Sequence, residues 1–367
     1  MLYRATGTFN RTYEDELALY QVPLPKITLA VIAILIFLVV PLTASEYLIN
    51  IFNFIGIAAL GAVGLNILLG YTGQISVGHG GFMAVGAYTC AVILREFPDF
   101  PWVLAMLGGG VGAAIVGIFF GIPSLRIKGL YLAVSTLAAQ LIIEWGINHW
   151  GWLSGGAQGS VYVAHPTYPS FSGGTLHMEQ MKLNVEYYYL IFIVLAIGLV
   201  VALNLFRTHL GRSFVAVRDR DLAAEIIGID IFRTKLSAFG ISSFYAGVTG
   251  ALYAFYYTIA NVEAFSLLIS IQFLAMCVIG GLGSILGSIF GAIFVVLLPI
   301  VNDLVVRGLG GALLGWDDAT ASALLPKVNL LLFGGLIMFF LIVEPDGLAK
   351  LWRNITDYFR VWPFPYM

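Results

Sequence analysis

The sequence predicts an all-α polytopic membrane protein with about ten transmembrane helices and with both chain ends inside the cell. Three observations predict this class. Apolar residues make up 60% of the 367-residue chain and charged residues 10%, whereas soluble domains carry roughly 25% charged residues. The apolar residues form runs near the length of about 20 residues that a helix needs to cross a bilayer. Lys and Arg concentrate in alternate connections between these runs.

Ten apolar runs are candidate membrane-spanning helices. Because several are short or broken by glycine, the count is accurate to about one or two helices. The transmembrane region is therefore expected over 27–343, with polar segments, 1–26 and 344–367, before and after it. The ten runs are 27–44, 47–69, 77–94, 102–122, 129–147, 187–206, 235–257, 267–281, 284–304 and 328–343.

The distribution of positive charge orients these helices. Lys and Arg are enriched in the cytoplasmic connections of membrane proteins, and an inside N-terminus leaves only four of the 18 Lys and Arg residues outside. With an even number of spans, the C-terminus is then also inside. The four exceptions are Arg95, Lys182, Arg307 and Lys327.

Both terminal segments are expected to lie along the inner membrane surface. In GLAKLWRNITDYF, residues 347–359, five apolar side chains share one helical face while Lys350 and Arg353 lie elsewhere. Such an amphipathic helix suits the boundary between headgroups and acyl chains. The run RTYEDELALY, residues 11–20, is a weaker candidate. The five apolar residues are Leu348, Leu351, Trp352, Ile355 and Phe359.

Small residues recur at every fourth position in two of the expected helices. Because small residues let helix backbones approach closely in lipid, these stripes predict tight helix packing without a chemical role. The two cysteines, Cys90 and Cys277, lie in apolar runs and are expected to be packing residues as well. The stripes consist of Gly109, Ala113, Gly117 and Gly121, and of Gly283, Gly287 and Gly291.

The longest polar stretch, 148–185, is expected on the outer side and is named the outer loop. The spacings of 16 and 12 residues between its three histidines match no common metal motif, so no metal site is expected. Its aromatic residues Trp150, Trp152, Tyr162 and Tyr168 favour either a docking surface or anchoring at the interface, and the sequence does not separate the two. The histidines are His149, His165 and His177.

The chain lacks the motifs of several functional classes. There is no G-x-x-x-x-G-K phosphate loop, H-E-x-x-H zinc motif or G-x-S-x-G nucleophile motif, so no ATP hydrolysis or other hydrolytic activity is expected. A net charge of −2 gives no reason to expect nucleic-acid binding. Ionisable residues are scarce within the expected helices. Glu144, near the outer end of one helix, is the exception that would suit a proton-driven transporter.

The most charged inside connection is expected over 207–234 and is named the coupling segment. Within it, Asp221 can cap a short helix and Gly228 can end it. Ala223 and Ala224 would give this helix a small face with polar borders. Taken alone, the pattern fits equally well a helix that inserts into a groove on another protein and a solvated, positively charged loop. The border residues are Arg218, Arg220 and Glu225.

The run LAAEIIGI, residues 222–229, resembles the coupling motif of ATP-binding-cassette (ABC) importer permeases, in which two alanines and a glycine have the spacing of Ala223, Ala224 and Gly228. Three longer runs resemble the branched-chain amino acid permease family, in its LivM-like branch. KGLYLAVSTLA and SGGAQGS add weaker support. The resemblance covers roughly residues 45–345, and the three runs are GYTGQISVGHGGFMAVGAY, AVRDRDLAAEIIGIDIFRTKLSAFGISSFYAGVTGALYA and MCVIGGLGSILGSIFGA.

The resemblance implies an ABC importer permease fold within an assembly of several subunits. A second, related permease would form a heterodimer with this chain. Two cytoplasmic ATPases would bind and hydrolyse ATP-Mg, so this chain would hold no cofactor and catalyse no reaction. A periplasmic binding protein would deliver a branched-chain or other small apolar amino acid for passage across the bacterial inner membrane. The residues of ATPase coupling would be Arg218, Asp219, Asp221, Ala223, Ala224, Glu225 and Gly228.

Three alternatives stay open from the sequence. A permease of the same family that carries urea or small amides would have the same architecture. An ATP-independent channel or facilitator would transport without partner subunits. A purely structural membrane subunit would tolerate substitutions along the expected path.

The run GYTGQISVGHGGF, residues 70–82, interrupts the apolar pattern near the inner ends of two expected helices. Irregular backbone within a membrane is tolerated where protein or a water-filled cavity surrounds it, and broken helices in transporters often point backbone N–H groups at substrate. We therefore expect a helix break beside a translocation path, with Ser76 capping the next helix. The run GGLGSILGSIFGA repeats the pattern Gly-x-x-Gly-polar-Ile and only weakly indicates an internal repeat. The expected path residues are Gly73, Gln74, Ser76 and His79.

Overall fold

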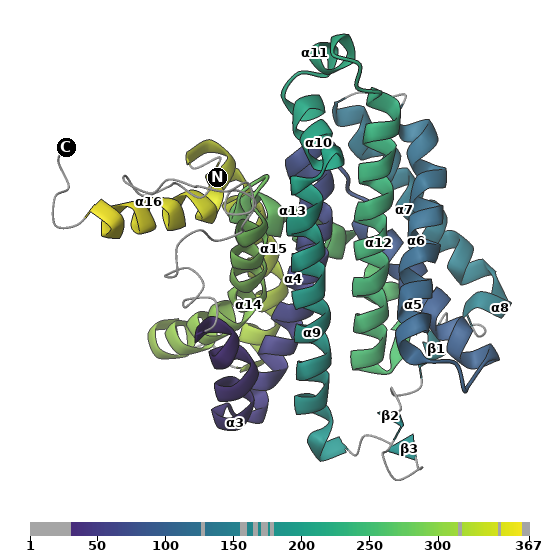
Figure 1. Cartoon of the computed structure of the whole chain (residues 1–367). Helices are drawn as coiled ribbons and strands as arrows, with labels where there is room; N and C mark the ends of the chain where they lie inside the picture. Colours follow the sequence, from purple (N-terminus) through teal and green to yellow (C-terminus); the bar gives the residue numbers. More distant parts are fainter. Residues whose placement is uncertain are drawn as a thin grey trace. The chain divides into compact units, whose positions relative to one another are not determined.

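A computed structural model describes residues 31–125, 129–154, 160–163, 168–169, 175–176, 180–314, 318–343 and 346–361. The chain divides into two compact units, Met1–Asn50 and Ile51–Met367, and each is described by itself. Both are predominantly helical in their described parts (Figure 1). The predicted interfacial segment 1–26 lies outside the described residues, as do the last six residues of the C-terminal segment.

The described part of the first unit is an apolar helix with one irregular turn. A π-helical stretch, Leu35–Val39, runs directly into α3, Val40–Thr43. Pro41 lies at the start of α3, where its missing N–H leaves the preceding turn one hydrogen bond short. A single π-helical turn is a common way for a helix to absorb such a defect. The exposed large side chains before α3 are aliphatic, as the predicted span over 27–44 requires.

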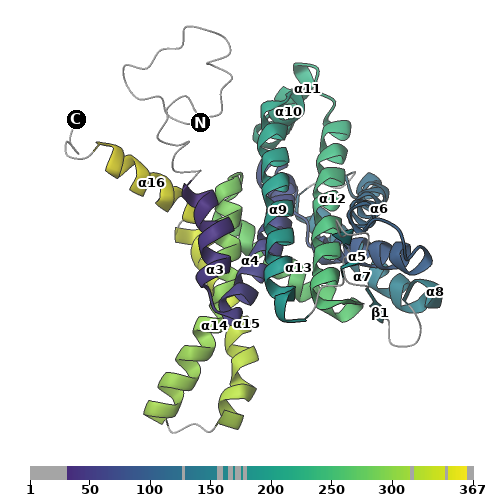
Figure 2. The same ribbon diagram turned by 60° about the horizontal axis from the view of Figure 1, so that its bottom comes forward.

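The second unit contains most of α4, Glu46–Thr72, and all later elements. Figures 1 and 2 show α9 leading into α10 and α11 at one end of the unit, with α12 returning alongside α9. The helices are α5 His79–Glu96, α6 Trp102–Ser124, α7 Leu130–His149, α8 Gly151–Ser154, α9 Gln180–Arg207, α10 His209–Asp219, α11 Asp221–Ile226, α12 Ile231–Tyr257, α13 Leu267–Gly280, α14 Ile285–Leu314, α15 Asp318–Val343 and α16 Gly347–Val361. The strands are β1 Ser160–Tyr162, β2 Tyr168–Pro169, β3 Thr175–Leu176 and β4 Ile259–Asn261, and a 3-10 helix spans Val262–Phe265.

Six helices in the described part of the chain are long and apolar enough to cross a membrane, and all six fall on predicted spans. Two further predicted spans are shorter apolar helices, Val31–Thr43 and Leu324–Phe340. The remaining two predicted spans, 77–94 and 129–147, are helical as α5 and α7 but are not among the six. The chain is a multi-pass membrane protein, whereas the count of ten and the orientation stay predictions. The six helices are Glu46–Thr72, Trp102–Ser124, Asn184–Arg207, Ile231–Tyr257, Val262–Gly280 and Ile285–Val306.

The composition of α5 follows from its central position in the second unit. It packs against α6, α7, α12 and α13, and most of its side chains are buried. A helix that is surrounded by other helices needs no continuous apolar surface toward lipid. This explains why α5 carries His79 and three glycines and still lies inside the helix bundle.

The predicted small-residue stripe of α6 is confirmed as a packing face, since all four of its members are buried. A side chain at Gly109 would meet the carbonyl oxygen of Gly86 in α5 at 2.5 Å, so the two backbones are in direct contact. The second stripe is confirmed for Gly287 and Gly291, whose backbones contact α13. Gly283 departs from the prediction, because it precedes α14 and belongs to a helix break.

Short strands correct the all-α prediction in detail. β1, within the outer loop, pairs antiparallel with β4, which follows α12, and β2 pairs with β3. Thr258 ends α12 in the left-handed conformation with a φ of 59°. Its carbonyl oxygen accepts a hydrogen bond from the Val163 N–H at 2.9 Å. The outer loop is therefore tied to the connection between α12 and α13, which the sequence analysis did not anticipate.

Three smaller predictions have different outcomes. Both cysteines are buried and free, as expected of packing residues. Nδ1 of His149 lies 2.9 Å from the backbone oxygen of Trp145, whereas His165 and His177 lie outside the described residues, so the absence of a metal site there stays a prediction. α16 has the predicted amphipathic character, but its position at the membrane surface stays a prediction. Its exposed apolar residues are Leu351, Trp352, Ile355 and Tyr358.

Candidate functional site

The predicted helix break between α4 and α5 is present and is named the first break, residues 73–78. None of its residues is helical, and α5 begins at His79. Gly73 has a φ of +69°, a conformation that residues with a side chain rarely adopt, so a glycine there lets the chain leave the helix. The break directs Gln74, Ser76 and His79 into the protein interior, each with at most 3% of its surface exposed.

Hydroxyl groups from neighbouring helices bind the backbone N–H groups around the start of α5. Thr136 in α7 and Ser270 in α13 each accept one such bond, at 3.0 and 2.7 Å. The prediction that Ser76 caps α5 is wrong, because the N-cap residue is Gly78, which makes no side-chain cap bond. Ser76 Oγ accepts from the Gly78 N–H at 3.4 Å, since the helix begins too far along the chain for Ser76 to reach its first turn.

Two buried atoms at this place have no hydrogen-bond partner among the described residues, Gln74 Oε1 and His79 Nε2. In contrast, Gln74 Nε2 donates to Thr72 Oγ1 at 2.8 Å and to the backbone oxygen of Lys235 at 3.2 Å. The His79 ring lies beside Phe273 of α13, with ring centroids 5.1 Å apart. Buried polar atoms without partners cost about 1–3 kcal/mol each and are rare in folded proteins.

A second break, residues 281–284, separates α13 from α14. Gly281 and Gly283 have φ angles of +115° and +77°. Asn66, buried within α4, holds this break: its Oδ1 accepts from the Gly283 N–H at 2.9 Å. Its Nδ2 donates to the Ser284 backbone oxygen at 2.9 Å and to Ser288 Oγ at 2.7 Å. The sequence analysis missed Asn66, although a carboxamide within an apolar span is a signal for interhelical hydrogen bonding.

The last turn of α4, directly before the first break, lies against the second break. A side chain at Gly70 would overlap the backbone nitrogen of Gly283. Nearer the N-termini of the same two helices, Cys277 Sγ donates to the Ala62 carbonyl oxygen at 3.4 Å. Because both contacts advance in the same direction along the two sequences, α4 and α13 run parallel. Gly73 and Gly283 occupy matching positions in the repeated sequence pattern and share a positive φ. The similar runs therefore form similar, adjacent chain reversals at the same end of two parallel helices.

The short helix predicted for the coupling segment is present as α11, and Gly228 ends it as expected. Gly228 adopts a φ of +88°, with open space around its α-carbon. Its N–H donates to the Glu225 oxygen and the N–H of Ile229 donates to the Ala224 oxygen, both at 3.0 Å. This pair of bonds is a Schellman motif, which fixes the end of a helix firmly.

Two details of α11 differ from the prediction. Asp221 is the first helical residue rather than the cap, which is Arg220, and its carboxylate accepts from the Leu222 N–H at 3.0 Å. Ala223 is exposed whereas Ala224 is buried, because adjacent helical residues do not share a face. The exposed surface of α11 is formed by large apolar side chains instead. These are Leu222, Ile226 and Ile227, with exposed fractions of 69%, 86% and 73%.

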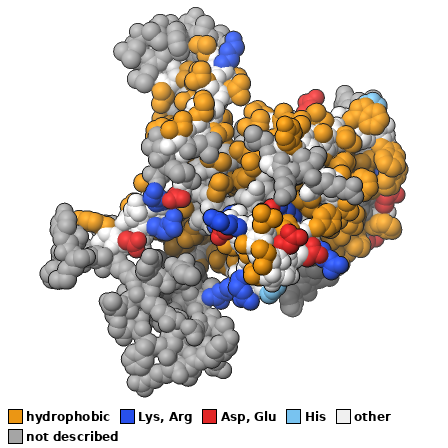
Figure 3. Space-filling view, turned by 90° about the horizontal axis from the view of Figure 1, so that it is seen from above, with side chains coloured by type: hydrophobic (Ala, Val, Ile, Leu, Met, Phe, Trp, Pro, Cys, Tyr) orange, Lys and Arg blue, Asp and Glu red, His pale blue; other side chains and the backbone are white. Residues whose placement is uncertain are grey.

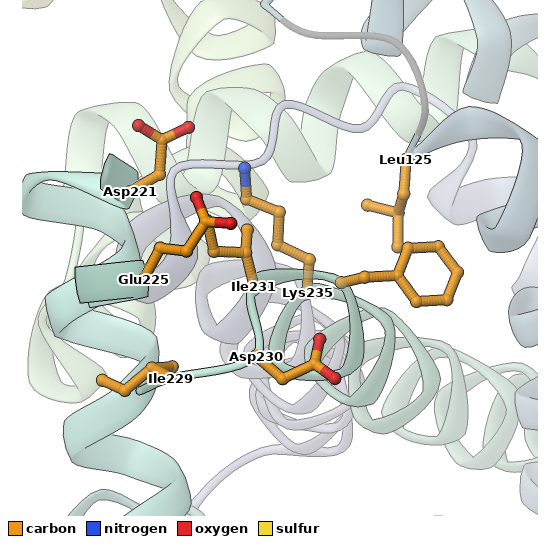
Figure 4. A pocket seen from close by; sticks show the side chains of 8 residues that line it. Leu125, Asp221, Glu225, Ile229, Asp230, Ile231 and Lys235 are labelled. Atoms are coloured by element: carbon orange, nitrogen blue, oxygen red, sulfur yellow. The ribbon is translucent and has the colours of Figure 1, made fainter. Parts of the chain in front are cut away.

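Charged side chains gather on the end of the second unit that carries α11 (Figure 3). A pocket of about 380 Å³ lies between α11 and the start of α12 (Figure 4). Its lining combines three carboxylates and one ammonium group with apolar side chains. The lining residues are Asp221, Glu225, Asp230, Lys235, Leu125, Ile229, Ile231 and Phe232.

Two side chains connect this end of the unit to the first break. Arg218 of α10 was expected at the border of α11, but its guanidinium group turns toward α4: Nη1 donates to the Gly70 oxygen at 2.8 Å. Its Nε donates to the Asp219 carboxylate at 3.0 Å. On the α12 side, the bond from Gln74 to the Lys235 backbone makes a second connection. The predicted path residues and the predicted coupling segment are therefore neighbours.

Glu144 takes part in a chain of hydrogen bonds rather than standing alone. Its carboxylate accepts from Gln140 Nε2 at 2.7 Å, and Gln140 Oε1 accepts from Ser270 Oγ at 2.6 Å. Ser270 in turn accepts from the Gly80 N–H in the first turn of α5. The chain joins α7, α13 and α5, and Gln140 is a second buried polar residue that the sequence analysis missed.

These features define a class of protein. Six apolar helices in the described part of the chain, two neighbouring helix breaks and a firmly capped helix with an exposed apolar surface are typical of a multi-pass transport subunit.

Comparison with known proteins identifies the family. The family model described as "Branched-chain amino acid transport system / permease component" matches residues 47–341, and the chain belongs to this family. The high-affinity branched-chain amino acid transport system permease protein LivM of Salmonella typhimurium is 31% identical over 306 residues, 79% of this chain and 67% of the relative. LivM of Escherichia coli is 29% identical over 89% of this chain and 76% of the relative.

A relative from the other permease branch is also similar. The probable branched-chain amino acid transport permease protein LivH of Methanocaldococcus jannaschii is 28% identical over 62% of this chain and 70% of the relative. No solved structure matches the chain. The resemblance inferred from the sequence runs is thus confirmed over most of the chain.

Proposed function

We propose that this chain is one of two permease subunits of an ATP-driven importer in the bacterial inner membrane. The substrate is a branched-chain or other small apolar amino acid, as the names of the LivM relatives support. Similarity to both LivM and LivH proteins supports a heterodimer with a second, related permease. A periplasmic binding protein delivers the substrate to the side of the outer loop, and two cytoplasmic ATPases supply the energy.

The exposed apolar surface of α11 is the observation that carries this proposal. Burying a large aliphatic side chain stabilises an association by about 1.5–3 kcal/mol, and three such side chains stand on one short helix. The Schellman motif at Gly228 and the buried Ala224 hold this helix in place. A rigid apolar helix with charged surroundings suits insertion into a groove on a cytoplasmic ATPase. This arrangement favours a subunit that borrows its energy source over a self-sufficient channel.

The substrate path in this proposal passes the first break. Gln74 Oε1 can accept a hydrogen bond from a substrate ammonium group, and His79 Nε2 can accept or donate according to its tautomer. Gly73 supplies the chain reversal and Ser76 steadies the turn before α5. The path alternates between outward and inward access: the ATPases move α11, and this movement changes the conformation of the two breaks.

Ala223→Arg tests the docking of the ATPases, because Ala223 is exposed while the neighbouring Ala224 is buried. We expect the variant to enter the membrane and pair with the second permease. Copurification of the ATPases should fall by about tenfold or more, since a contact at the centre of an interface is worth about 2 kcal/mol. Glu263→Arg, a change at an exposed position in the 3-10 helix that follows β4, is the matched control. Undiminished copurification with Ala223→Arg would refute the docking role of α11.

The substrate class is tested with the complete assembly. Uptake of leucine, isoleucine, valine and urea is compared in vesicles that contain both permeases, the ATPases and the binding protein. We expect uptake of the amino acids and little uptake of urea. Uptake of urea alone would assign the chain to the small-amide branch instead.

A further inference from the structure

Arg218 lies in the last turn of α10, directly before the chain turns into α11. Its Nη1 donates to the carbonyl oxygen of Gly70, in the last turn of α4, at 2.8 Å. The last carbonyl groups of a helix have no partner within that helix and carry partial negative charge, so a guanidinium group is a favourable partner. The side chain is 37% exposed, which leaves it within reach of both the protein interior and the surface.

The same side chain also lies against the second break. A Cβ added to Gly283 would come within 2.9 Å of Arg218 Nη1, and one added to Gly73 within 3.3 Å of Arg218 Cγ. Both glycines have positive φ angles, so each marks the place where a chain reverses. One guanidinium group therefore contacts the end of α4 and the reversals after α4 and α13 together.

The connection to α11 is short and stiff. α10 is a regular helix of 11 residues whose N-terminus is capped by Thr208, and a single extended residue, Arg220, links it to α11. The Asp219 carboxylate accepts a hydrogen bond from Arg218 Nε at 3.0 Å and so orients the guanidinium group. The opposite connection, from Gln74 to the Lys235 backbone, is a neutral bond of 3.2 Å. Charge-assisted hydrogen bonds are roughly twice as strong as neutral ones, so Arg218 is the stronger of these two connections.

We infer that Arg218 is a positioning residue that transmits movement of α11 to both helix breaks. This inference rests on the proposed function, in which partner ATPases move α11. Because the guanidinium group holds the Gly70 carbonyl while it fills the space beside Gly73 and Gly283, a displacement of α10 moves both chain reversals together. Without this group, the ATPases still dock on α11, but opening and closing of the path are no longer coupled to ATP hydrolysis.

Arg218→Gln removes the charge and the reach to Gly70, and Arg212→Gln is its matched control. Arg212 lies on the same helix, and among the described residues its Nη1 donates locally, to the Arg207 oxygen at 3.2 Å. Both variants are reconstituted as complete assemblies with ATPases, second permease and binding protein. The measured quantity is amino acid transported per ATP hydrolysed. We expect a fall of about tenfold for Arg218→Gln, as loss of a charged hydrogen bond predicts, and none for Arg212→Gln.

This ratio separates positioning from mere structural support. A loss of stability would lower transport and ATP hydrolysis together and leave their ratio unchanged. Equal ratios for the two glutamine variants would overturn the inference and reduce Arg218 to a cap on α4. If Arg218→Gln does not assemble, Arg218→Lys is compared with Arg212→Lys, because lysine keeps the charge but cannot reproduce the fork of the guanidinium group. A lower ratio for Arg218→Lys supports the inference, and equal ratios refute it.

Failure of the proposed function would look different. The wild-type assembly would then transport nothing with ATP, or would transport equally well without ATP. Neither result depends on Arg218, so the two claims are tested separately in the same experiment.

Discussion

At the scale of single residues, Gln74 is one of two side chains that link the first break, where we propose the substrate path, to the end of the unit that carries α11. Its amide nitrogen binds Thr72 and the Lys235 backbone, while its amide oxygen is buried without a partner among the described residues. A carboxamide can serve both tasks because it carries donors and an acceptor on one rigid group. An apolar side chain of similar size could fill the space but perform neither task.

Gln74→Leu is therefore expected to reduce uptake by about tenfold or more without loss of assembly, since the acceptor and the bond to Lys235 are both removed. Uptake by the complete assembly and size-exclusion chromatography of the purified complex measure the two effects. Gln272→Leu is the matched control, because Gln272 lines an apolar groove between α13 and α15. Equal uptake by the two variants would show that the first break serves helix packing and not transport.

Individual residues also show which features could be predicted from the sequence and which could not. The glycines and polar residues of the first break indicated buried, irregular backbone, and Gln74, Ser76 and His79 are indeed buried there. The caps assigned to Ser76 and Asp221 were wrong because capping depends on the exact first residue of a helix. A shift of one to three residues, which hydrophobic patterns do not resolve, changes the bond that a side chain makes.

At the scale of elements, the two breaks are held by a few polar side chains inside apolar helices. Asn66 alone makes three short hydrogen bonds to the second break and its surroundings, at 2.7–2.9 Å. Water is scarce within a bilayer, so these backbone groups depend on protein partners. The Asn66 carboxamide therefore stabilises the shape of the second break.

Asn66→Ala should lower the unfolding free energy of the permease by about 2–3 kcal/mol, because it leaves the Gly283 N–H and neighbouring groups without partners. Thermal unfolding in detergent measures this effect. Asn302→Ala is the control, since within the described parts of the chain Asn302 makes one side-chain hydrogen bond, to Asn329 at 2.6 Å, between α14 and α15. An equal or smaller loss for Asn66→Ala would contradict the role assigned to it.

Elements differed in how far the sequence could predict them. Long apolar helices such as α4 and α12 were predicted closely because their composition alone specifies them. The three-residue strands β1 and β4 were missed, since their pairing joins residues about a hundred positions apart in the sequence and leaves no local pattern. The apolar surface of α11 was not predicted, because the sequence does not show which face of so short a helix is exposed: Ala224 is buried, whereas Leu222, Ile226 and Ile227 are exposed.

At the scale of the whole molecule, α9 and α12 connect the two ends to which we assign functions. The coupling segment joins these helices at one end, and the outer loop and β4 meet their other ends. The enrichment of Lys and Arg predicts a cytoplasmic position for the first of these ends. The sequence could predict this arrangement, but the contact between the breaks and α10 depends on long-range packing that periodicity does not encode.

Orientation is tested with single cysteines at exposed positions. Glu225→Cys places a thiol on α11, and Asp99→Cys places one in the connection after α5. The native Cys90 and Cys277 are fully buried and should react little. An impermeant maleimide should label Asp99→Cys in intact cells and Glu225→Cys only after lysis. The reverse labelling pattern would show that the chain has the opposite orientation in the membrane.

The dependence of transport on partner ATPases is the central claim, and uptake into proteoliposomes measures it most directly. Vesicles with the two permeases alone are compared with vesicles that also contain the ATPases, with and without ATP, and the binding protein is present in all of them. We predict leucine uptake only when both ATPases and ATP are present. Leucine uptake by the permeases alone, at a rate that ATP does not change, would contradict the account and identify the chain as part of a passive channel.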